Sequence, residues 1–382
     1  MITMYILHLP SWFPEAQKPY TGNFIEKHIE AIAAQVSSIT LRVVKTDDLK
    51  QKFTDQLVSP DNRVITFYVL QKKGFLNKVY HKLFILFLYQ KGIRYMEEKY
   101  GIPALIHLHV SLPLGNLALR LKKRWKIPLL LSEHWSVYHP ENWGALPLKR
   151  QREVLHILKN VDALTSVSTH LLQAIKKIYL IKNGFVVSNV VKTDLFKPVE
   201  HQNQTIRILH VSTLDPKAKN VTGILEVITK LKEIRADFVL DVISEFESQE
   251  AIQYVRDYQL EKWVRFLGSM SEDQVAREMG KSDFFLLFSN YENQPCVILE
   301  SFSCGIPVIA TSVGGIPDIV NTERGILVEK KDQQALLQAI LQMFDTYSTY
   351  DKINIRDYAV NNFSPSQIGK AFHHIYKMLL EH

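Results

Sequence analysis

Short apolar runs rich in β-branched residues alternate with helical patterns along the whole 382-residue chain. This alternation predicts parallel sheets covered by their connecting helices. The runs fall into two sets on either side of a polar segment near residues 188–203, and the chain is too long for one typical core. We therefore expect an α/β protein with two doubly wound domains, whose ligand-binding edges face each other across a cleft.

The expected strands lie near residues 4–9, 39–44, 64–70, 105–108, 129–132 and 163–167, and near 206–212, 238–243, 264–267, 284–288, 308–310 and 326–328. Helical spacing of apolar residues is clearest at residues 23–35, 221–234, 333–344 and 364–380. We place the domain boundaries so that the first domain holds residues 1–195 and the second holds residues 196–362.

Composition excludes several classes of protein. The net charge of +7 favours anionic partners without naming one, and no RNA-binding pattern is present, so we expect no nucleic-acid partner. The two cysteines, Cys296 and Cys304, offer neither a disulfide framework nor metal-ligand spacing. The longest apolar run, Leu83–Tyr89, is far shorter than the roughly 20 residues of a membrane span. We expect a cytoplasmic protein, or one peripheral to the inner face of the membrane.

A basic and apolar segment in the first half suggests how such membrane contact would arise. Lys72, Lys73, Lys78, Lys82 and Lys91 surround the apolar residues Phe75, Leu76, Leu83, Phe84, Leu86, Phe87 and Leu88. This composition suits a helix lying on an anionic membrane that carries a lipid-linked acceptor. The alternative is a helix packed in the core with a solvated basic edge.

The most informative stretch runs from residue 284 to residue 311. An apolar strand leads into a polar loop with Glu292, then into a helix that starts near Pro295, carries Glu300 and stops at Gly305. The helix N-terminus suits a phosphate, and a carboxylate on an otherwise apolar helix needs partners. The alternative is a helix-capping Glu292 with a solvated Glu300. The following Gly314-Gly315 pair makes either a backbone nest for an anion or merely a turn.

Glu292 and Glu300, followed by residues 304–311 and 313–320, resemble the C-terminal signature of glycosyltransferase family 4, which comprises retaining enzymes of the GT-B fold. Looser matches are the glycine loop Tyr20–Phe24, the strand ends Ile106–His109 and Ser132–Trp135, the segment His210–Leu214 with Lys219 and Asn220, and the closing Asn362–Ser364. The resemblance implies two Rossmann-like domains and a C-terminal helix, residues 363–382, that crosses back to the first domain.

The resemblance also implies roles for individual residues. His134 would lie over the transferred sugar, Lys219 would neutralise the diphosphate and Glu292 would bind the sugar. Glu300 would hold the ribose hydroxyls and His109 would face the acceptor. Main-chain atoms would approach the diphosphate and sugar near Gly22, Gln294, Pro295, Cys296 and Val297, and would hold the base near Arg265. Because His107 and His109 alternate along one strand, we expect one of them to point away from the cleft, and a strand-end histidine often has only a structural role.

The implied chemistry needs no covalent protein nucleophile. Cleavage of a sugar–diphosphate bond builds negative charge on the leaving phosphate, which fixed donors and a cation stabilise. The resemblance implies a glycosyltransferase of the hexosyltransferase class, a UDP- or GDP-sugar donor, a saccharide or lipid-linked acceptor, and no cofactor. No Asp-x-Asp occurs in the chain, which agrees with the metal independence of the family.

The chain departs from the family at two places. Ser212 and Thr213 stand where the family has glycine and arginine, so an arginine expected on the diphosphate is missing. Lys217 is our candidate for the second positive charge, with hydroxyl hydrogen bonds from Ser212 and Thr213. The family sequence Glu-Gly-Phe-Gly is replaced by Glu292–Pro295, which leaves the donor sugar open.

Two other functions fit a chain of this kind. A sugar-nucleotide epimerase of the same fold shares the nucleotide site, and a catalytically silent nucleotide-sugar-binding subunit fits the missing arginine. The Glu292 and Glu300 block favours the transferase. A nicotinamide dehydrogenase is disfavoured because no Gly-x-Gly-x-x-Gly follows the first strand.

Overall fold

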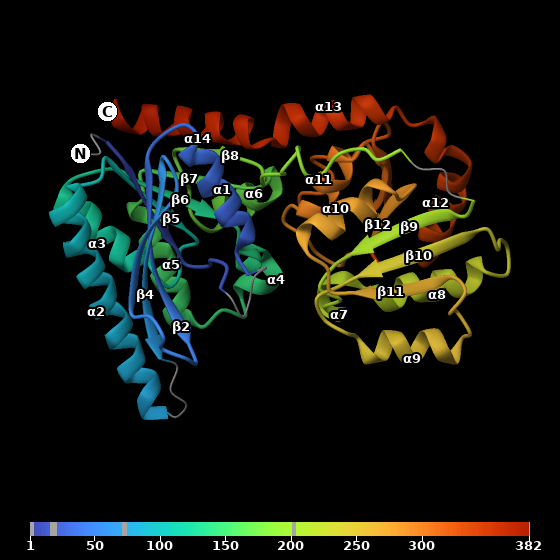
Figure 1. Cartoon of the computed structure of the whole chain (residues 1–382), viewed down its shortest axis with the longest axis horizontal. Coiled ribbons are helices and arrows are strands. Elements are labelled where there is room, and N and C mark those ends of the chain that lie inside the picture. Colours follow the sequence, from blue (N-terminus) through green and yellow to red (C-terminus); the bar gives the residue numbers. More distant parts are fainter. Residues whose placement is uncertain (1–3, 16–20, 71–74, 201–203, 382) are drawn as a thin grey trace. The chain divides into compact units, whose positions relative to one another are not determined.

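The computed structural model describes residues 4–15, 21–70, 75–200 and 204–381, and it divides the chain into two α/β units (Figure 1). Unit 1 comprises residues 1–167, 171–190 and 365–382, and unit 2 comprises residues 168–170 and 191–364. The sequence predicts boundaries after residues 195 and 362, whereas the units divide after residues 190 and 364. Tyr20, Lys72, Lys73 and the end of the expected linker, residues 201–203, lie outside the described residues.

Unit 1 is built on an eight-stranded sheet in the order β3-β4-β2-β1-β5-β6-β7-β8. Only β3 runs antiparallel to its neighbour, and the reversal in strand order falls between β1 and β5. The strands are β1 (Ile6–Pro10), β2 (Ser38–Thr46), β3 (Phe53–Ser59), β4 (Asn62–Leu70), β5 (Leu105–His109), β6 (Leu129–Glu133), β7 (Ala163–Ser166) and β8 (Gly184–Val186).

The sequence analysis missed β3 and β8, and its expectation of a wholly parallel sheet is wrong for β3. No residue of β3 is buried, so this edge strand lacks the apolar alternation that would reveal it. Strand β8 has only three residues, none of them buried.

Two helical layers cover the sheet of unit 1. Apolar residues of α1 (Asn23–Ala33) and α14 (Pro365–Leu380) share a core with Ile6 and Leu105, whereas Leu7 and Ile106 face the opposite core. That second core is closed by α2 (Phe75–Tyr100), α3 (Gly115–Trp125), α5 (Leu148–Asn160) and α6 (Thr169–Ile178). The short helices η1 (Ser136–Tyr138) and α4 (Pro140–Trp143) follow β6.

The sequence of α2 leaves open whether this helix lies on a membrane or packs in the core. Leu88 and Tyr89 are buried in the core, but Leu83 and Phe87 are 64% and 55% exposed. The helix is therefore packed on the sheet and still presents apolar side chains to solvent. None of the helices in the described residues is long and apolar enough to cross a bilayer.

Unit 2 has a six-stranded, wholly parallel sheet in the order β11-β10-β9-β12-β13-β14. This is the doubly wound order in which the strand sequence reverses between the first and fourth strands, here β9 and β12. The strands are β9 (Ile206–Val211), β10 (Phe238–Ile243), β11 (Val264–Gly268), β12 (Phe284–Leu287), β13 (Val308–Thr311) and β14 (Gly325–Val328).

Each face of this sheet has its own apolar core. One face packs against α8 (Val221–Leu231), α9 (Gln249–Asp257) and α12 (Gln333–Thr346). The other packs against α10 (Glu272–Gly280), α11 (Cys296–Ser303) and α13 (Lys352–Phe363). The short helices α7 (Pro216–Lys219) and η2 (Tyr347–Thr349) complete the unit. In a doubly wound sheet, ligands bind beyond the carboxyl ends of the strands at the reversal, which directs attention to the loops after β9 and β12.

Candidate active site

Three loops of unit 2 meet at the carboxyl ends of β9, β12 and β13. The backbone N–H of Asn290 donates to the carbonyl of Ala218 at 2.7 Å, and the Asn290 side-chain amide donates to the carbonyl of Lys217 at 3.0 Å. The Thr311 hydroxyl donates to the carbonyl of Ser289 at 2.8 Å. These bonds hold the loops after the three strands together at one edge of the sheet.

Lys219 and Glu292 form an ion pair at this edge, although they are far apart in the sequence. The Ser289 hydroxyl also donates to Glu292 Oε1 at 2.8 Å. The Lys219 and Glu292 side chains are 18% and 11% exposed, so the pair is only partly shielded from solvent. The structure therefore brings together two of the three residues predicted to be catalytic, and it leaves them where a ligand can reach them.

Ser212 is held in place directly after β9. His210 Nδ1 donates to the carbonyl of Leu286 at 2.9 Å, which leaves Nε2 to accept from the Ser212 hydroxyl at 2.8 Å. Burial lowers the pKa of His210 to about 4, against a weaker opposing effect of its hydrogen bond to Leu286, so the ring is neutral at pH 7. The Ser212 hydroxyl therefore donates to His210 and is not free to donate to a phosphate. This differs from the sequence-based expectation that Ser212 would donate a hydrogen bond to the diphosphate.

Thr213 and Lys217 are both exposed beside this loop. Within the described part of the chain, the Lys217 ammonium has no carboxylate partner, whereas Lys219 is paired. Leu214 between them has a positive φ of 54°, a conformation that an L side chain adopts at a cost. The two lysines thus differ: one is a solvated charge and the other is fixed in the site.

Glu300 lies on α11 and is 7% exposed, so the alternative of a solvated Glu300 is wrong. The helix is short and packs Ile298, Leu299 and Phe302 into the core, which draws Glu300 inward. Pro295 is its N-cap, and Gly305, with a φ of 72°, ends it as the sequence predicts. Gln294 and Pro295 are buried, while Cys296 and Val297 are half-buried at the first turn.

The Gly314-Gly315 pair is more than a turn. A Cβ on Gly314 would overlap the carbonyl oxygen of Glu292, and one on Gly315 would overlap that of Asn293. Gly314 also has a φ of 57°, and the N–H of Gly315 donates to the Asn293 carbonyl at 2.9 Å. Both glycines are needed because this loop lies directly against the backbone of the Glu292 loop.

The Arg265 side chain is used within the sheet. Its guanidinium donates to both carboxylate oxygens of Asp241, at 2.6 and 2.8 Å, and Arg207 binds the same carboxylate. The prediction for Arg265 concerned main-chain atoms and stays a prediction. Gly268 at the end of β11 has a φ of 73° and its carbonyl accepts from the Ser244 N–H at 3.2 Å.

In unit 1, the first turn of α1 lies beside His134, with Gly22 at the start of that helix. Gly22 has a φ of 75° at the start of α1, and a Cβ there would lie 2.7 Å from the carbonyl carbon of Trp12. The Phe24 ring, in the first turn of α1, lies 4.7 Å from the His134 ring. His134 follows β6 and is 8% exposed; burial, and then the neighbouring His28, lower its pKa well below 6.5. It is therefore a neutral imidazole at pH 7.

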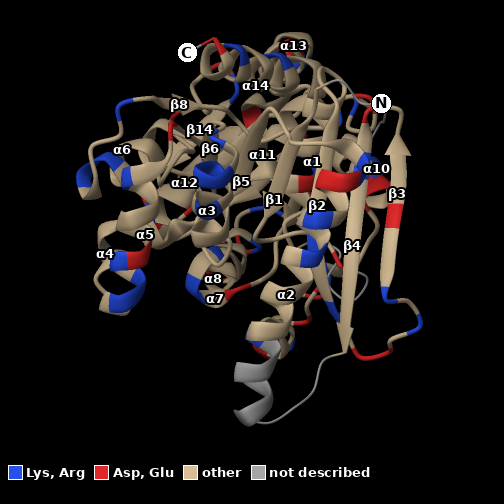
Figure 2. Cartoon of the chain, turned by 90° about the vertical axis from the view of Figure 1, so that its left-hand side faces the viewer, with Lys and Arg blue, Asp and Glu red and all other residues tan. Residues whose placement is uncertain are grey.

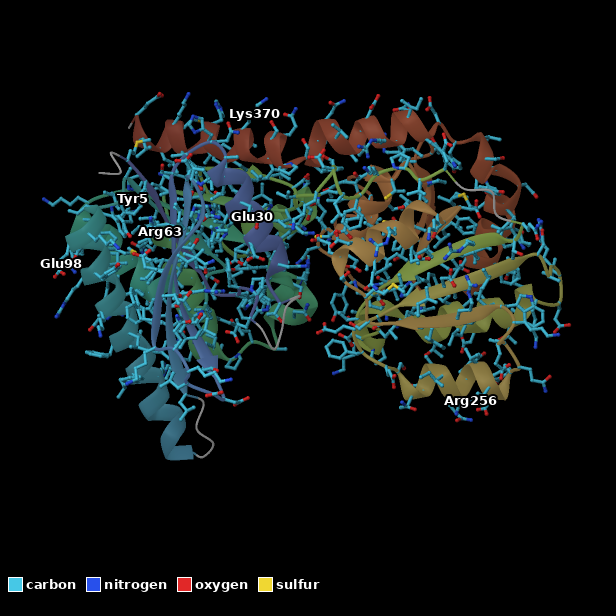
Figure 3. All side chains as sticks on the ribbon, in the orientation of Figure 1. Tyr5, Glu30, Arg63, Glu98, Arg256 and Lys370 are labelled. Carbon is cyan, nitrogen blue, oxygen red and sulfur yellow. The ribbon has the colours of Figure 1, made fainter. Side chains whose placement is uncertain are left out.

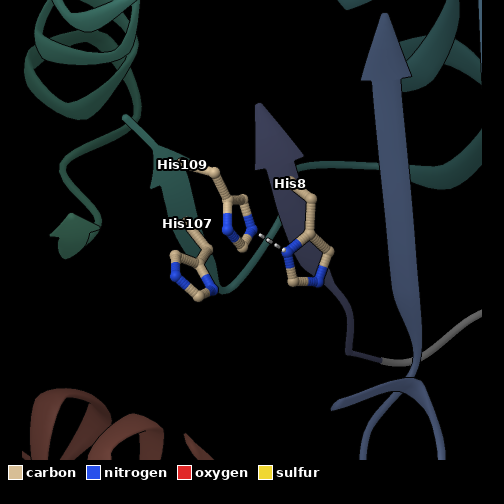
Figure 4. A group of neighbouring side chains, drawn as sticks. All are labelled: His8, His107 and His109. Atoms are coloured by element: carbon tan, nitrogen blue, oxygen red, sulfur yellow. Dashed lines mark hydrogen bonds between the residues drawn. The ribbon is translucent and has the colours of Figure 1, made fainter. Parts of the chain in front are cut away.

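His107 and His109 lie on the same face of the sheet, with ring centroids 3.9 Å apart (Figure 4). The expectation that one of them points away is wrong, because residues i and i+2 of a strand share a face. Both are fully buried, as is His8 on the neighbouring strand β1. His109 Nε2 lies 3.1 Å from His8 Nδ1, and burial lowers the pKa of all three rings.

This cluster has the ligand type of a metal site, since nitrogen atoms of all three rings lie within 4.8 Å of one another. Hydrogen bonds already use the nitrogens of two of them: His8 bonds to His109 and Ser38, and His107 bonds to Tyr376 and Ser132. The partners come from strands and from α14, so His8 and His107 are held in a polar network in the core, whereas the buried His109 Nδ1 has no hydrogen-bond partner within the described residues.

Glu133, directly before His134, is a functional candidate that the sequence analysis missed. Its Oε1 accepts from the Ser111 N–H at 2.8 Å and from the Tyr138 hydroxyl at 2.6 Å. Burial raises its pKa, and these hydrogen bonds oppose that shift. The carboxyl thus fixes the loop after β5 and the loop that carries His134. An acidic residue ending the apolar run Leu129–Leu131 was the signal in the sequence.

Two family models match the chain. The model described as Glycosyltransferase Family 4 matches residues 55–195, and the model described as Glycosyl transferases group 1 matches residues 191–359. Among curated relatives, an uncharacterized glycosyltransferase of Methanocaldococcus jannaschii is 27% identical over 90% of this chain and 90% of its own length. A putative teichuronic acid biosynthesis glycosyltransferase of Bacillus subtilis is 23% identical over 98% of both chains.

Solved structures show the same fold. Sucrose-phosphate synthase from Thermosynechococcus elongatus has a TM-score of 0.77 at 20% identity and covers 99% of both chains. The Anabaena protein HepE, in complex with UDP, has a TM-score of 0.73 at 16% identity over 98% of this chain and 100% of its own. At these identities the likeness speaks for the fold alone.

Proposed function

The chain belongs to glycosyltransferase family 4 and has the GT-B fold, and we propose that it is a retaining enzyme whose donor is a nucleoside-diphosphate sugar. The observation that carries the proposal is the Lys219–Glu292 pair, set at the strand-order reversal of unit 2 beside α11 with its buried Glu300. A cation, a helix N-terminus and two acidic groups at one sheet edge suit a ligand with a diphosphate and several hydroxyls.

The proposed reaction exchanges one bond at the anomeric carbon. The bond from that carbon to the diphosphate oxygen breaks, and a bond to the acceptor hydroxyl oxygen forms on the same face. The hydroxyl proton passes to the leaving phosphate. Lys219 leaves Glu292 to balance the charge that grows on the diphosphate, while Glu292 turns to the sugar hydroxyls. Glu300 holds the ribose, and the proposal assigns His134 to the transferred sugar. His109 is fully buried among the core histidines of unit 1, so the proposal gives it no contact with the acceptor.

The proposed catalyst works without a divalent metal, because Lys219, Lys217 and the amide groups at the start of α11 supply the positive potential. Ser212 takes no part in this, since its hydroxyl is bonded to His210. The solved relatives include HepE with UDP, and the curated relatives include a teichuronic acid enzyme. We therefore propose a UDP- or GDP-sugar donor, a saccharide or lipid-linked acceptor and a role in polysaccharide synthesis.

A thermal-shift screen of UDP-, GDP- and ADP-sugars tests the donor site. Binding to the native state stabilises it by RT ln(1 + [L]/Kd), about 2.7 kcal/mol at a hundredfold excess over Kd. We expect one nucleotide class to raise the unfolding temperature in the presence of EDTA, and Glu300→Ala to abolish that rise. If no nucleotide sugar stabilises the protein, the proposed donor site is refuted. If stabilisation appears only in the presence of Mg²⁺, the proposed metal independence is refuted.

A further inference from the structure

The net charge of +7 conceals a strong separation of charge along the chain. Residues 71–190 contain 19 Lys and Arg against six Asp and Glu, a net charge of +13. Residues 191–364, all in unit 2, contain 18 Lys and Arg against 25 Asp and Glu, a net charge of −7. The positive charge therefore belongs to a single segment of unit 1 and has no counterpart in the donor-binding unit.

That segment forms the helical layer of α2, α3, α5 and α6 on one face of the unit 1 sheet. Blue segments in Figure 2 mark Lys and Arg along these helices. One hollow of about 430 Å³ lies between α2, α3 and α5 and is lined by Lys82, Lys149 and Arg152 among others. A second, of about 290 Å³ between α2 and α3, is lined by Arg94, Arg120 and Arg124.

A larger hollow of about 1350 Å³ continues from α3 and α5 to the end of α14. It shares the lining residue Asn116 with the first hollow and Arg120 with the second, so the three hollows adjoin one another along α3. Its basic lining residues include Lys122, Lys123 and Lys126. The rest of the lining mixes polar residues, among them Asn160 and Asp162, with apolar residues such as Ile127, Phe185 and Leu379.

Most of these cations are not neutralised within the protein. Lys122, Arg124 and Arg150 are paired with Asp162, Glu97 and Glu153. The others have no carboxylate partner in the part of the chain that the structure describes; they are Lys82, Arg94, Arg120, Lys123, Lys126, Lys149 and Arg152, all exposed. Uncompensated charge of one sign on one face attracts an anionic partner from a distance.

Exposed apolar side chains accompany the charge. Leu83 and Phe87 on α2 are 64% and 55% exposed, and Leu148 at the start of α5 is 69% exposed. Leu83 and Leu148 are the chain neighbours of Lys82 and Lys149, which line the same hollow. A surface for nucleic acid or another soluble polyanion has no use for solvated leucines, whereas a bilayer takes cations at its headgroups and apolar side chains beneath them.

We propose that the layer formed by α2, α3, α5 and α6 docks unit 1 onto a bilayer of anionic phospholipids. The uncompensated cations bind headgroup phosphates, which the hollows accommodate, and Leu83, Phe87 and Leu148 enter the interface between headgroups and acyl chains. Docking concerns unit 1 alone and does not depend on the transferase proposal. It gives a physical reason for the charge separation, because the acidic unit 2 is repelled by the same surface.

Flotation of the full chain with vesicles tests the proposal. We expect binding to vesicles of equal phosphatidylglycerol and phosphatidylcholine, weakened by salt, and little binding to pure phosphatidylcholine. The variant Arg120→Glu/Lys123→Glu/Arg152→Glu should lose at least about a hundredfold in affinity, since each basic residue near an anionic surface contributes roughly fivefold. The matched control is Lys262→Glu/Lys330→Glu/Lys370→Glu, with Lys370 on α14 (Figure 3).

A second variant separates a bilayer from a soluble polyanion. Leu83→Ser/Phe87→Ser keeps every charge and should weaken vesicle binding about tenfold or more, with no effect on heparin binding. Circular dichroism of both variants and the control checks that each of them is folded. The proposal is overturned if the wild type does not float with anionic vesicles, if the control loses as much as the Arg120 variant, or if the Leu83 variant floats like the wild type.

Discussion

At the scale of single residues, the ion pair between Lys219 and Glu292 is the central feature of the proposed site. Without a donor they neutralise each other, and a partly exposed ion pair contributes little to stability. Their position is better explained by a ligand that separates them, because a diphosphate and a sugar offer each of them a stronger partner. Glu300 differs from both in being buried on a helix, a position that fits the ribose-binding role proposed for it.

Replacement of Lys219 tests its assignment against that of Lys217. Lys219→Ala should lower kcat a hundredfold or so with a smaller change in donor affinity, since phosphate charge grows toward the transition state. Lys217→Ala, which removes an exposed and unpaired ammonium, should have a smaller effect. Steady-state kinetics of both variants decides. Turnover of Lys219→Ala within threefold of wild type would contradict the assignment, and a large loss in Lys217→Ala alone would transfer the role to Lys217.

Replacement of Glu300 and replacement of Glu292 should impair different steps, nucleotide binding and turnover respectively. Glu300→Ala should weaken nucleotide binding roughly ten- to a hundredfold, the usual effect of losing a hydrogen bond to a charged group. Glu292→Ala should retain bound donor and lose turnover. Calorimetric titration with the nucleoside diphosphate and turnover assays are compared with Glu261→Ala, an exposed glutamate of unit 2. Wild-type binding and turnover in both site variants would disprove the site.

The sequence reveals some of these residues and hides others for physical reasons. Glu300 stands out because it interrupts an apolar helix, and Glu133 could have been found because it ends an apolar run. His8 does not stand out, because its importance comes from His109 on another strand. The hydrogen bond from Ser212 to His210 cannot be predicted from the sequence either, since it depends on how the Leu286 carbonyl of β12 orients the histidine ring.

At the scale of elements, strands buried on both faces are easiest to predict. The range Phe238–Ile243 agrees with the observed β10, and other core strands differ by one or two residues at their ends. Helix α11 is also predicted, since Pro295 and Gly305 bracket it. The exposed edge strands β3 and β8 escape because their pairing is decided by neighbouring strands and not by their own side chains.

Gly314→Ala tests whether the loop after β13 shapes the Glu292 loop. The added Cβ would overlap the Glu292 carbonyl oxygen, and a positive φ costs an L residue about 1–2 kcal/mol. We expect a loss of more than 2 kcal/mol of unfolding free energy, or a native state that no longer binds donor. Gly144→Ala, where a Cβ meets no atom within 4 Å, is the control. Equal stability and donor binding in the two variants would contradict the packing.

At the scale of the whole molecule, the two units differ in charge and in buried histidines. Burial lowers the pKa of His8 to about 3 and of His28 to about 4, and it lowers the pKa values of His107, His109 and His134 well below 6.5. All belong to unit 1, whereas His210 is the comparable residue of unit 2. Because these buried imidazoles stay neutral, the stability of unit 1 should decrease as the pH falls.

Acidification should therefore destabilise unit 1 first. Below about pH 6.5 these histidines bind protons in the unfolded state but not in the native state, where their pKa values are lowered. Each of them therefore lowers the unfolding free energy by about 1.4 kcal/mol per pH unit. Four of the five tryptophans, Trp12, Trp125, Trp135 and Trp143, lie in unit 1, and Trp263→Phe removes the fifth. Between pH 7.5 and pH 5 the midpoint of thermal unfolding of this variant, followed by tryptophan fluorescence, should fall by about 20 °C or more, since five such histidines together cost about 10 kcal/mol. A constant midpoint would contradict the buried neutral rings.

The central claim is that the chain transfers a sugar from a nucleotide donor with retention. Proton NMR of the first-formed sugar, with EDTA present and with water as acceptor, tests it most directly, because the anomeric signal is read before mutarotation. We expect release of nucleoside diphosphate together with a sugar of the same anomeric configuration as the donor, and loss of both in Lys219→Ala. A product of opposite configuration, or release that requires a divalent metal, would contradict it.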